Sequence, residues 1–341
     1  MRTNWKNVAV LAMVAATMLL TGGRARATGP DPKYVPADAK WVVHVDVDRL
    51  AKTKTFEIIK RQAEKEDPKV REKVTQLGEA LGARLPDDVH GVTLIGRDFD
   101  EKQAVLVVRA KVDKDRLLGM AKAMPGYTSS MHGTVEVSTW KDANQPNAVS
   151  GAFLAEDVLV LGWTPADVGR MLDLSAGREK PAPADGLLAG AADGTEVMAY
   201  LAANGLAELQ RMHPVSPLIS QVTSARISLT ERGDDLTLGA TLNVTSPDIA
   251  KQVKGAMEGF KALLGLAALD DDGDEDAKLF AELSQRATVT AEGSTVTLNW
   301  PVPVKRLHEL FEEDEKKAKA TTAPTATPGS ESGEKAENPQ G

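Results

Sequence analysis

The most regular alternation of apolar and polar positions lies in residues 41–48, WVVHVDVD. The odd-numbered positions of this segment are all apolar, which predicts a half-buried strand with those side chains in the core. His44, Asp46 and Asp48 share the other face of the predicted strand. We therefore expect these three side chains to be solvated, with Asp48 capping the next helix.

Helical and strand periodicities alternate along the rest of the chain. Helices are predicted near residues 56–66, 68–81, 113–124, 164–174 and 246–264, and from about 304. Strands or hairpins are predicted near residues 92–112, 134–140, 149–163, 225–244 and 287–300. Hairpins that alternate with single helices indicate an α+β fold, in which antiparallel sheets built from β-hairpins are each covered on one side by helices.

The two halves of the chain share part of this order. A shift of 133 positions places Val92–Tyr127 on Ala225–Phe260 without a gap, and Asp113 then meets Ser246, both suitable helix N-caps. Met124 meets Met257 in the same alignment, and a repeat predicts equivalent buried positions for them. Few residues are identical, so two interpretations stay open: an internal repeat, or convergence on a common β-β-α pattern.

The ends of the chain differ from its middle. Residues 1–27 have a basic start, an apolar run and Ala25-Arg26-Ala27, the pattern of a secretory signal peptide cleaved after Ala27. An uncleaved membrane anchor is the alternative. Residues 314–341 lack large apolar side chains and predict a disordered tail. A segment rich in Gly, Pro and charge at 175–185 suggests two α+β domains, 28–183 and 184–313.

Composition excludes several classes of protein. The 341 residues include 41 basic and 49 acidic side chains, for a net charge of −8, and no cysteine. Loss of residues 1–27 leaves 37 basic and 49 acidic side chains, a net charge of −12. The missing cysteines exclude disulfides, thiolate metal sites and cysteine nucleophiles. The acidic balance argues against nucleic acid as a partner, and signal cleavage would leave no stable membrane anchor.

His44, Asp46 and Asp48 are the sharpest candidate for chemistry. Alternate residues of a strand lie about 6.6 Å apart, so two such side chains can converge on one metal ion. This spacing supports a metal-dependent hydrolase that uses His44 and Asp46. The competing interpretation, which we prefer, is the solvated face of an amphipathic strand, because no HExxH or other multi-histidine motif accompanies these residues.

An acidic run at residues 270–276 is a second candidate. Asp270, Asp272 and Asp274 lie close to Gly273 and suggest a weak calcium-responsive module. However, an EF-hand loop centred on Gly273 would place Ala268 and Leu279 at ligand positions, so the motif fails. A solvated, self-repelling loop is the preferred interpretation.

Residues 36–50, PADAKWVVHVDVDRL, together with the VTLIG hairpin and the strands that end in tryptophan, resemble uncharacterised exported bacterial proteins of unknown function. The resemblance implies a bacterial envelope location, periplasmic or at the cell surface. It implies no activity and no functional residue.

These observations favour an exported soluble protein with a binding or structural role, more consistent with a non-enzyme than with an enzyme. No catalytic motif such as GxSxG or GxGxxG occurs, and no cofactor is expected. The expected partner is a protein or a small-molecule ligand.

Overall fold

The structure is a computed structural model that describes residues 29–100, 103–141, 147–183, 185–191, 196–208, 219–267, 275–306 and 309. The strands are β1 (Trp41–Asp46), β2 (Val89–Gly96), β3 (Ala104–Ala110), β4 (Thr128–His132), β5 (Val135–Lys141), β6 (Ala148–Ala155), β7 (Val158–Gly162), β8 (Val197–Asn204), β9 (Val222–Arg232), β10 (Asp235–Val244), β11 (Thr288–Glu292) and β12 (Thr295–Pro303). The α-helices are α2 (Val47–Leu50), α3 (Lys54–Glu66), α4 (Val70–Leu81), α5 (Lys114–Ala123), α6 (Pro165–Ser175), α8 (Pro247–Ala267) and α9 (Glu275–Gln285). Short 3₁₀ turns are η1 (Pro32–Tyr34), η3 (Leu206–Glu208) and η4 (Ile219–Gln221).

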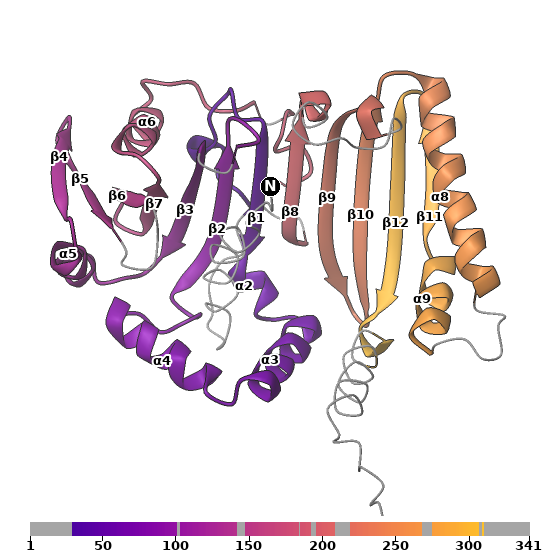
Figure 1. Ribbon diagram of the computed structural model, residues 1–341, viewed down its shortest axis with the longest axis horizontal. Coiled ribbons are helices and arrows are strands. Elements are labelled where there is room, and N and C mark those ends of the chain that lie inside the picture. The colour runs from indigo at the N-terminus through magenta and orange to yellow at the C-terminus, as the bar shows by residue number, and fades with distance from the viewer. Residues whose placement is uncertain are drawn as a thin grey trace, which may run out of the picture.

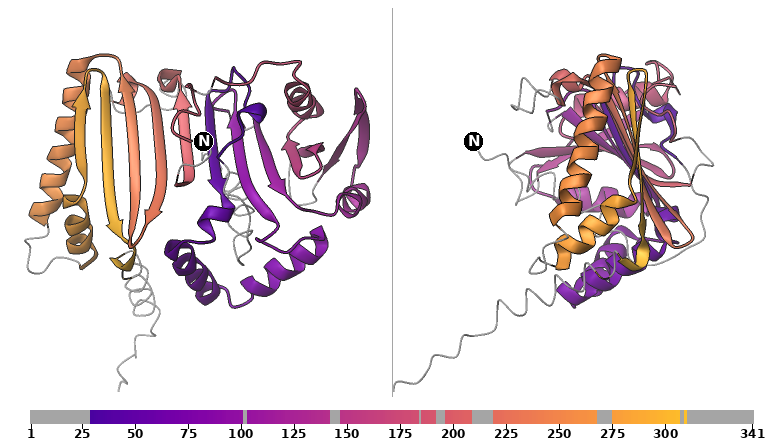
Figure 2. Two further views of the ribbon diagram at one scale, coloured as in Figure 1. Left: turned by 180° about the vertical axis from the view of Figure 1, so that it is seen from behind. Right: turned by 90° about the vertical axis from the view of Figure 1, so that its right-hand side faces the viewer.

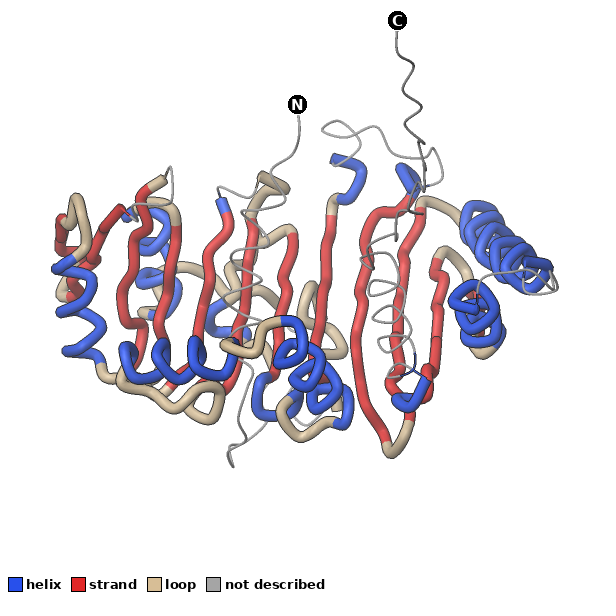
Figure 3. The backbone as a smooth tube through the Cα atoms, turned by 60° about the horizontal axis from the view of Figure 1, so that its bottom comes forward, coloured by secondary structure: helices blue, strands red, loops and turns tan. Residues whose placement is uncertain are grey.

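All twelve strands join one antiparallel sheet in the order β11-β12-β10-β9-β8-β1-β2-β3-β7-β6-β5-β4. Figures 1 and 3 show the strands as one continuous row, with α5 near one end and α8 and α9 at the other. The predicted α+β class is confirmed. Strands β1 to β7 precede the segment 175–185, and strands β8 to β12 follow it. The two sets join where β1 pairs with β8, so the predicted hairpins build a single sheet.

Helices cover both faces of the first half of the sheet, as β3 demonstrates. Val105 and Val107 of β3 lie in a core with Val168 and Met171 of α6. Leu106 of β3 lies in a second core. Since successive side chains of a strand point to opposite faces, these two cores lie on opposite sides of the sheet.

The helices α5 and α8 cover the same face at opposite ends of the sheet. Residues paired across neighbouring strands share a face, and one such row continues through the central strands. It consists of Leu106, Leu94, Val43, Leu201, Ile227, Ala240 and Leu298. Its first member lies below α5 and its last lies below α8. The rear and side views show α8 and α9 along the sheet at that far end (Figure 2).

Local sequence signals fix several helix ends as expected. The side chain of Asp113 accepts a hydrogen bond from the Arg116 amide at the start of α5, and Thr164 caps α6 with Pro165 as the first residue. Gly82 ends α4 with φ +64°, a left-handed conformation that glycine adopts without strain. Ser246 Oγ accepts from the Ile249 amide, 3.3 Å away, at the start of α8.

Both segments of the suspected repeat consist of a hairpin followed by a helix, β2-β3-α5 and β9-β10-α8. Met124 and Met257 are half-buried rather than fully buried, and each lines an apolar cavity. Common ancestry of the two halves stays a prediction.

Candidate ligand-binding cavity

The alternating face of β1 is buried, contrary to our expectation from the sequence. His44, Asp46 and Asp48 are 5%, 2% and 4% exposed. The prediction of a solvated face is wrong because β1 lies between β8 and β2 in the middle of the sheet, with both faces covered. Moreover, β1 ends at Asp46, so Asp48 belongs to α2 and not to the strand.

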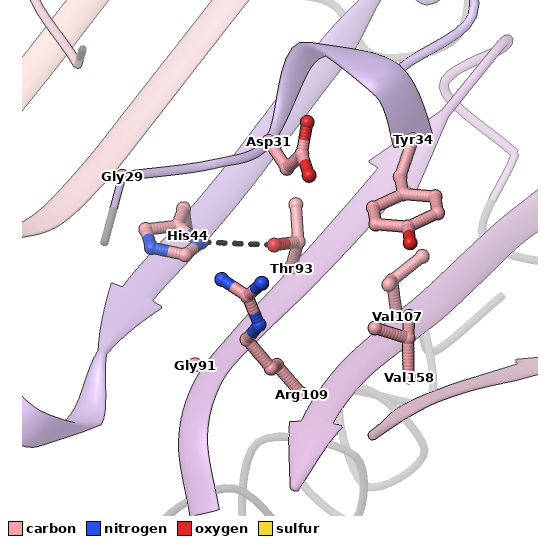
Figure 4. Close-up of a pocket in the computed structure, with 9 residues that line it drawn as sticks. All are labelled: Gly29, Asp31, Tyr34, His44, Gly91, Thr93, Val107, Arg109 and Val158. Carbon is pink, nitrogen blue, oxygen red and sulfur yellow. Dashed lines mark hydrogen bonds between the residues drawn. The ribbon is translucent and has the colours of Figure 1, made fainter. Parts of the chain in front are cut away.

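His44 lines a small pocket with residues of β2, β3, β7 and η1. Its Nδ1 atom lies 2.8 Å from Thr93 Oγ1, and its ring lies beside Gly91, where a Cβ atom would be 3.3 Å from His44 Cε1. Figure 4 shows His44, Thr93 and Arg109 side by side in this pocket. Its volume is about 30 Å³, room for about one water molecule. The pocket is therefore too small for an organic substrate.

The two aspartates have separate roles near α2. Asp46 caps α2, since its Oδ1 accepts a hydrogen bond from the Arg49 amide at 2.9 Å. Asp48 Oδ1 lies 3.2 Å from His90 Nδ1, while its Oδ2 is buried without a hydrogen-bond partner among the described residues. Burial raises the pKa of both carboxyl groups, and hydrogen bonds from Arg49 to Asp46 and from His90 to Asp48 oppose that rise.

The structure does not bring these three side chains together as ligands. His44 contacts Thr93, Asp46 contacts Arg49, and Asp48 contacts His90. In the part of the chain that the structure describes, no group of three or more His, Asp or Glu side chains is arranged to hold a metal ion. The calcium candidate formed by Asp270, Asp272 and Asp274 lies outside the described residues.

An apolar cavity of about 300 Å³ lies next to the sheet, beneath α5. Its walls come from α4, α5 and the facing side of β2, β3, β5, β6 and β7, and Trp140 is the only residue among them whose side chain carries a polar N or O atom. The lining residues are Leu81, Leu85, Val89, Leu106, Val108, Ala110, Val112, Leu117, Leu118, Met120, Ala121, Met124, Trp140, Gly151, Ala152, Phe153, Leu159 and Leu161.

The packing of α5 explains why the cavity exists. Helix α5 has no buried residue, although Leu117, Leu118 and Met124 face the cavity. By contrast, α6 buries five residues against the opposite face. A Cβ atom at Gly151 would lie 2.8 Å from Leu161 Cδ2 and 3.2 Å from Trp140 Cη2. Glycine at this position therefore lets the indole ring lie against the strand and form part of the wall.

A second apolar cavity of about 360 Å³ lies beneath α8. Val253, Met257 and Phe260 contribute to its wall from the helix, and Leu298 and Trp300 contribute from β12. The 133-residue shift relates Met257 here to Met124 in the first cavity, and Val253 to Met120. Each cavity thus lies between the sheet and the helix that follows a β-hairpin.

Neither cavity follows from a motif in the sequence. Their walls combine residues from four or more elements each, over residues 81–161 for the first cavity and 253–300 for the second. The only available signal was the pair of segments, each a hairpin followed by a helix, that the 133-residue shift aligns, with Met124 on Met257.

Comparisons with known proteins identify no family. No family model matches the chain, and no curated protein matches it. Two solved structures, crystal forms III and IV of TP0453, overlap with it at TM-scores of 0.45 and 0.46, with 12% and 10% sequence identity. The overlap covers 83% of this chain and 98% and 97% of those chains. Among the described residues, no helix is both long enough and apolar enough to cross a membrane.

Proposed function

We propose that this protein is an exported, non-enzymatic binding protein that holds an apolar small molecule beneath α5. The observation that carries the proposal is the cavity of about 300 Å³, whose side chains are apolar apart from the Trp140 indole. Its volume is at the lower end of the range for small-molecule sites, about 300–1,000 Å³. The signal-peptide pattern of residues 1–27 supports export.

The energetics of an unfilled cavity favour an apolar occupant. The apolar atoms that line this half-open space lack part of the contacts that a closely packed core would supply. Water is a poor occupant because a buried water molecule needs about 2–4 polar partners. An apolar solute, in contrast, regains the contacts that the lining atoms lack.

The position of α5 gives a ligand access to this cavity. The helix lies near the β4 end of the sheet, and Met120 is 40% exposed although it lines the cavity. A helix without buried side chains is held by few contacts, so it can separate from the sheet at low cost in free energy. We expect ligand entry by displacement of α5, with the sheet remaining in place.

Titration with a neutral apolar fluorophore, N-phenyl-1-naphthylamine, tests this function. Wild-type protein should increase the fluorescence of the dye at a defined stoichiometry. Ala121→Trp places an indole in the cavity and should remove one dye site. Ala123→Trp, the same substitution at an exposed position two residues along the helix, should leave the stoichiometry unchanged.

Thermal melting of both variants shows whether each has folded. If Ala121→Trp does not fold, Met120→Trp provides a second substitution on the same wall. A wild type that does not bind the dye would refute the proposal. A folded Ala121→Trp variant with unchanged stoichiometry would refute it as well.

A further inference from the structure

Helix α8 lies at the outer end of the sheet (Figure 2) and has one apolar side that is exposed. The sheet faces the helix on the side of Val253 and Met257, which line the cavity beneath it. Helix α9 packs on the side of Lys261, whose carbonyl oxygen accepts a hydrogen bond from Gln285 Nε2 at 3.2 Å. We call the remaining side the outer face of α8. Its exposed residues are Gly255, Ala256, Gly259, Phe260, Ala262, Leu263, Leu266 and Ala267.

The outer face of α8 exposes large apolar side chains next to one another. Phe260, Leu263 and Leu266 are 58%, 65% and 63% exposed. They are three of the four most exposed large apolar side chains in the part of the chain that the structure describes. The nearby carboxylate of Glu258 is turned away from them, since it forms an ion pair with Lys261 at 3.8 Å. Such a contiguous apolar surface is typical of an interaction site.

Two glycines of the outer face lie inside the helix. Glycine is less favourable than alanine within a helix. A Cβ atom at Gly255 or at Gly259 would meet no atom of another described element within 4 Å. Packing within the described chain therefore does not explain either glycine. On an exposed face, in contrast, glycine allows the backbone of a partner to approach closely.

We infer that the outer face of α8 binds a second copy of this chain, with the two α8 helices antiparallel. A twofold axis is the commonest symmetry of homo-oligomers, and it requires a surface that is complementary to itself. The outer face of α8 meets this requirement because it carries large and small side chains in a matching order. It is separate from the cavity beneath α5, so the inference does not depend on the proposed function.

The sequence of α8 defines how the two copies match. If the twofold axis passes level with residue 261, Leu263 lies opposite the partner's Gly259, two positions from the axis in each copy. Leu266 lies opposite the partner's Ala256, five positions from the axis. Large side chains thus meet small ones along the centre of the contact.

A parallel pair of helices lacks this complementarity. Each residue would then face its own copy, so Leu263 would meet the partner's Leu263 and Gly259 would meet the partner's Gly259. Large side chains would collide while the glycines left a gap between the helices. Shape complementarity therefore selects the antiparallel arrangement.

Sedimentation equilibrium of the purified protein, from micromolar concentration to about 1 mM, tests for the dimer. Wild type should change from monomer to dimer within this range, because a contact of one helix per copy is smaller than a standard interface of about 800 Å² per partner. Leu263→Glu/Leu266→Glu should weaken association at least about tenfold, because it places charged groups against apolar residues.

The matched control is Ile59→Glu/Met131→Glu, which adds the same two charges at other exposed apolar positions. It should associate like wild type. Thermal melting of both double variants shows whether each has folded, and Gly259→Arg provides a second substitution on the outer face. A wild type that stays monomeric, or an equal loss of association in the control, would overturn the inference.

Cysteine cross-linking tests the antiparallel arrangement. The chain has no cysteine, so each introduced thiol is the only one in its chain. Ten positions separate Ala256 from Leu266, about 15 Å along a helix, whereas a disulfide needs Cα atoms within about 7 Å. An oxidised mixture of Ala256→Cys and Leu266→Cys should therefore yield the dimer of one variant with the other, identified by its intact mass. Faster cross-linking within each variant alone would overturn the inference.

A lipid surface is the competing occupant of the outer face. Flotation of the protein with phosphatidylcholine vesicles tests for it. Wild type should not float with the vesicles. A monomeric wild type that binds them, with binding lost in Leu263→Glu/Leu266→Glu, would assign the outer face of α8 to lipid and overturn the inference. Dye binding beneath α5 should be the same in wild type and in this double variant, which shows that the two surfaces are independent.

Discussion

Replacing Asp46 by alanine should lower the free energy of unfolding by about 1–2 kcal/mol, the usual cost of a lost helix N-cap. Asp46 is 2% exposed, and its Oδ1 satisfies the Arg49 amide at 2.9 Å. Alanine removes this acceptor and leaves the amide without its partner. Asp46→Asn keeps an acceptor oxygen of the same shape and removes only the charge. We therefore expect the asparagine variant to be more stable than the alanine variant.

The pH dependence of the free energy of unfolding gives an independent test of the burial of Asp46. Burial raises the pKa of Asp46 above its ordinary value of 3.8, and the hydrogen bond and charge of Arg49 only partly oppose this rise. A carboxyl group with a raised pKa binds protons more strongly in the folded state than in the unfolded state. Its contribution to stability is fully present below the unfolded pKa and is lost as the pH rises through the folded pKa. Asp46→Asn should therefore gain stability relative to wild type as the pH increases above about 4.

Urea denaturation of wild type, Asp46→Ala and Asp46→Asn between pH 3 and pH 7 measures both effects. Comparing each variant with wild type at the same pH cancels the titration of the other carboxyl groups. A cost below about 0.5 kcal/mol for Asp46→Ala is typical of exposed positions, and would mean that this face of β1 is solvated after all. A stability difference between Asp46→Asn and wild type that does not change with pH would contradict the raised pKa.

Two further predictions concern chemistry and export. Protein purified without chelator should contain no stoichiometric zinc, iron or manganese; metal that is present in wild type and lost in His44→Ala would instead support the metal-dependent hydrolase. The intact mass of the exported protein should correspond to a chain that starts at Thr28, and a membrane-bound product that retains Met1 would contradict cleavage after Ala27.

Rules that act over a few residues predicted most of the helices, although α9 was missed. Asp113 and Thr164 begin their helices and Gly82 ends α4 as the sequence indicates, because a cap depends on hydrogen bonds within one turn. Hairpins and α+β class followed from the same local patterns. Strand β8 was missed because Val197–Asn204 includes several alanines and shows no clear alternation of apolar and polar residues.

The error at β1 has a different cause. Alternation shows that the two faces of a strand differ in polarity, but it does not show whether the polar face is solvated. Thr93 on the neighbouring strand and the cap of α2 satisfy His44 and Asp46 inside the protein. The partner of His44 depends on tertiary structure, because β2 is separated from β1 by three helices. The partner of Asp46 is local, the Arg49 amide three residues along the chain, because α2 begins where the strand ends. The alternation in residues 41–48 therefore identified His44 and Asp46 as unusual, but it wrongly placed their side chains in solvent.

The apolar cavities depend on tertiary structure even more than the burial of β1 does. The sequence predicts a helix at 113–124 after a hairpin, and the ordinary consequence of that arrangement is close packing of the helix on the sheet. In the structure, α5 covers that part of the sheet without burying any of its own residues, while α6 packs fully on the opposite face. In the first half of the sheet, the face below α6 is thus closely packed, whereas a cavity remains between the other face and α5. Because the helix is not needed to complete the core, it can move with little loss of stability, which is the property that a cover over a ligand site requires.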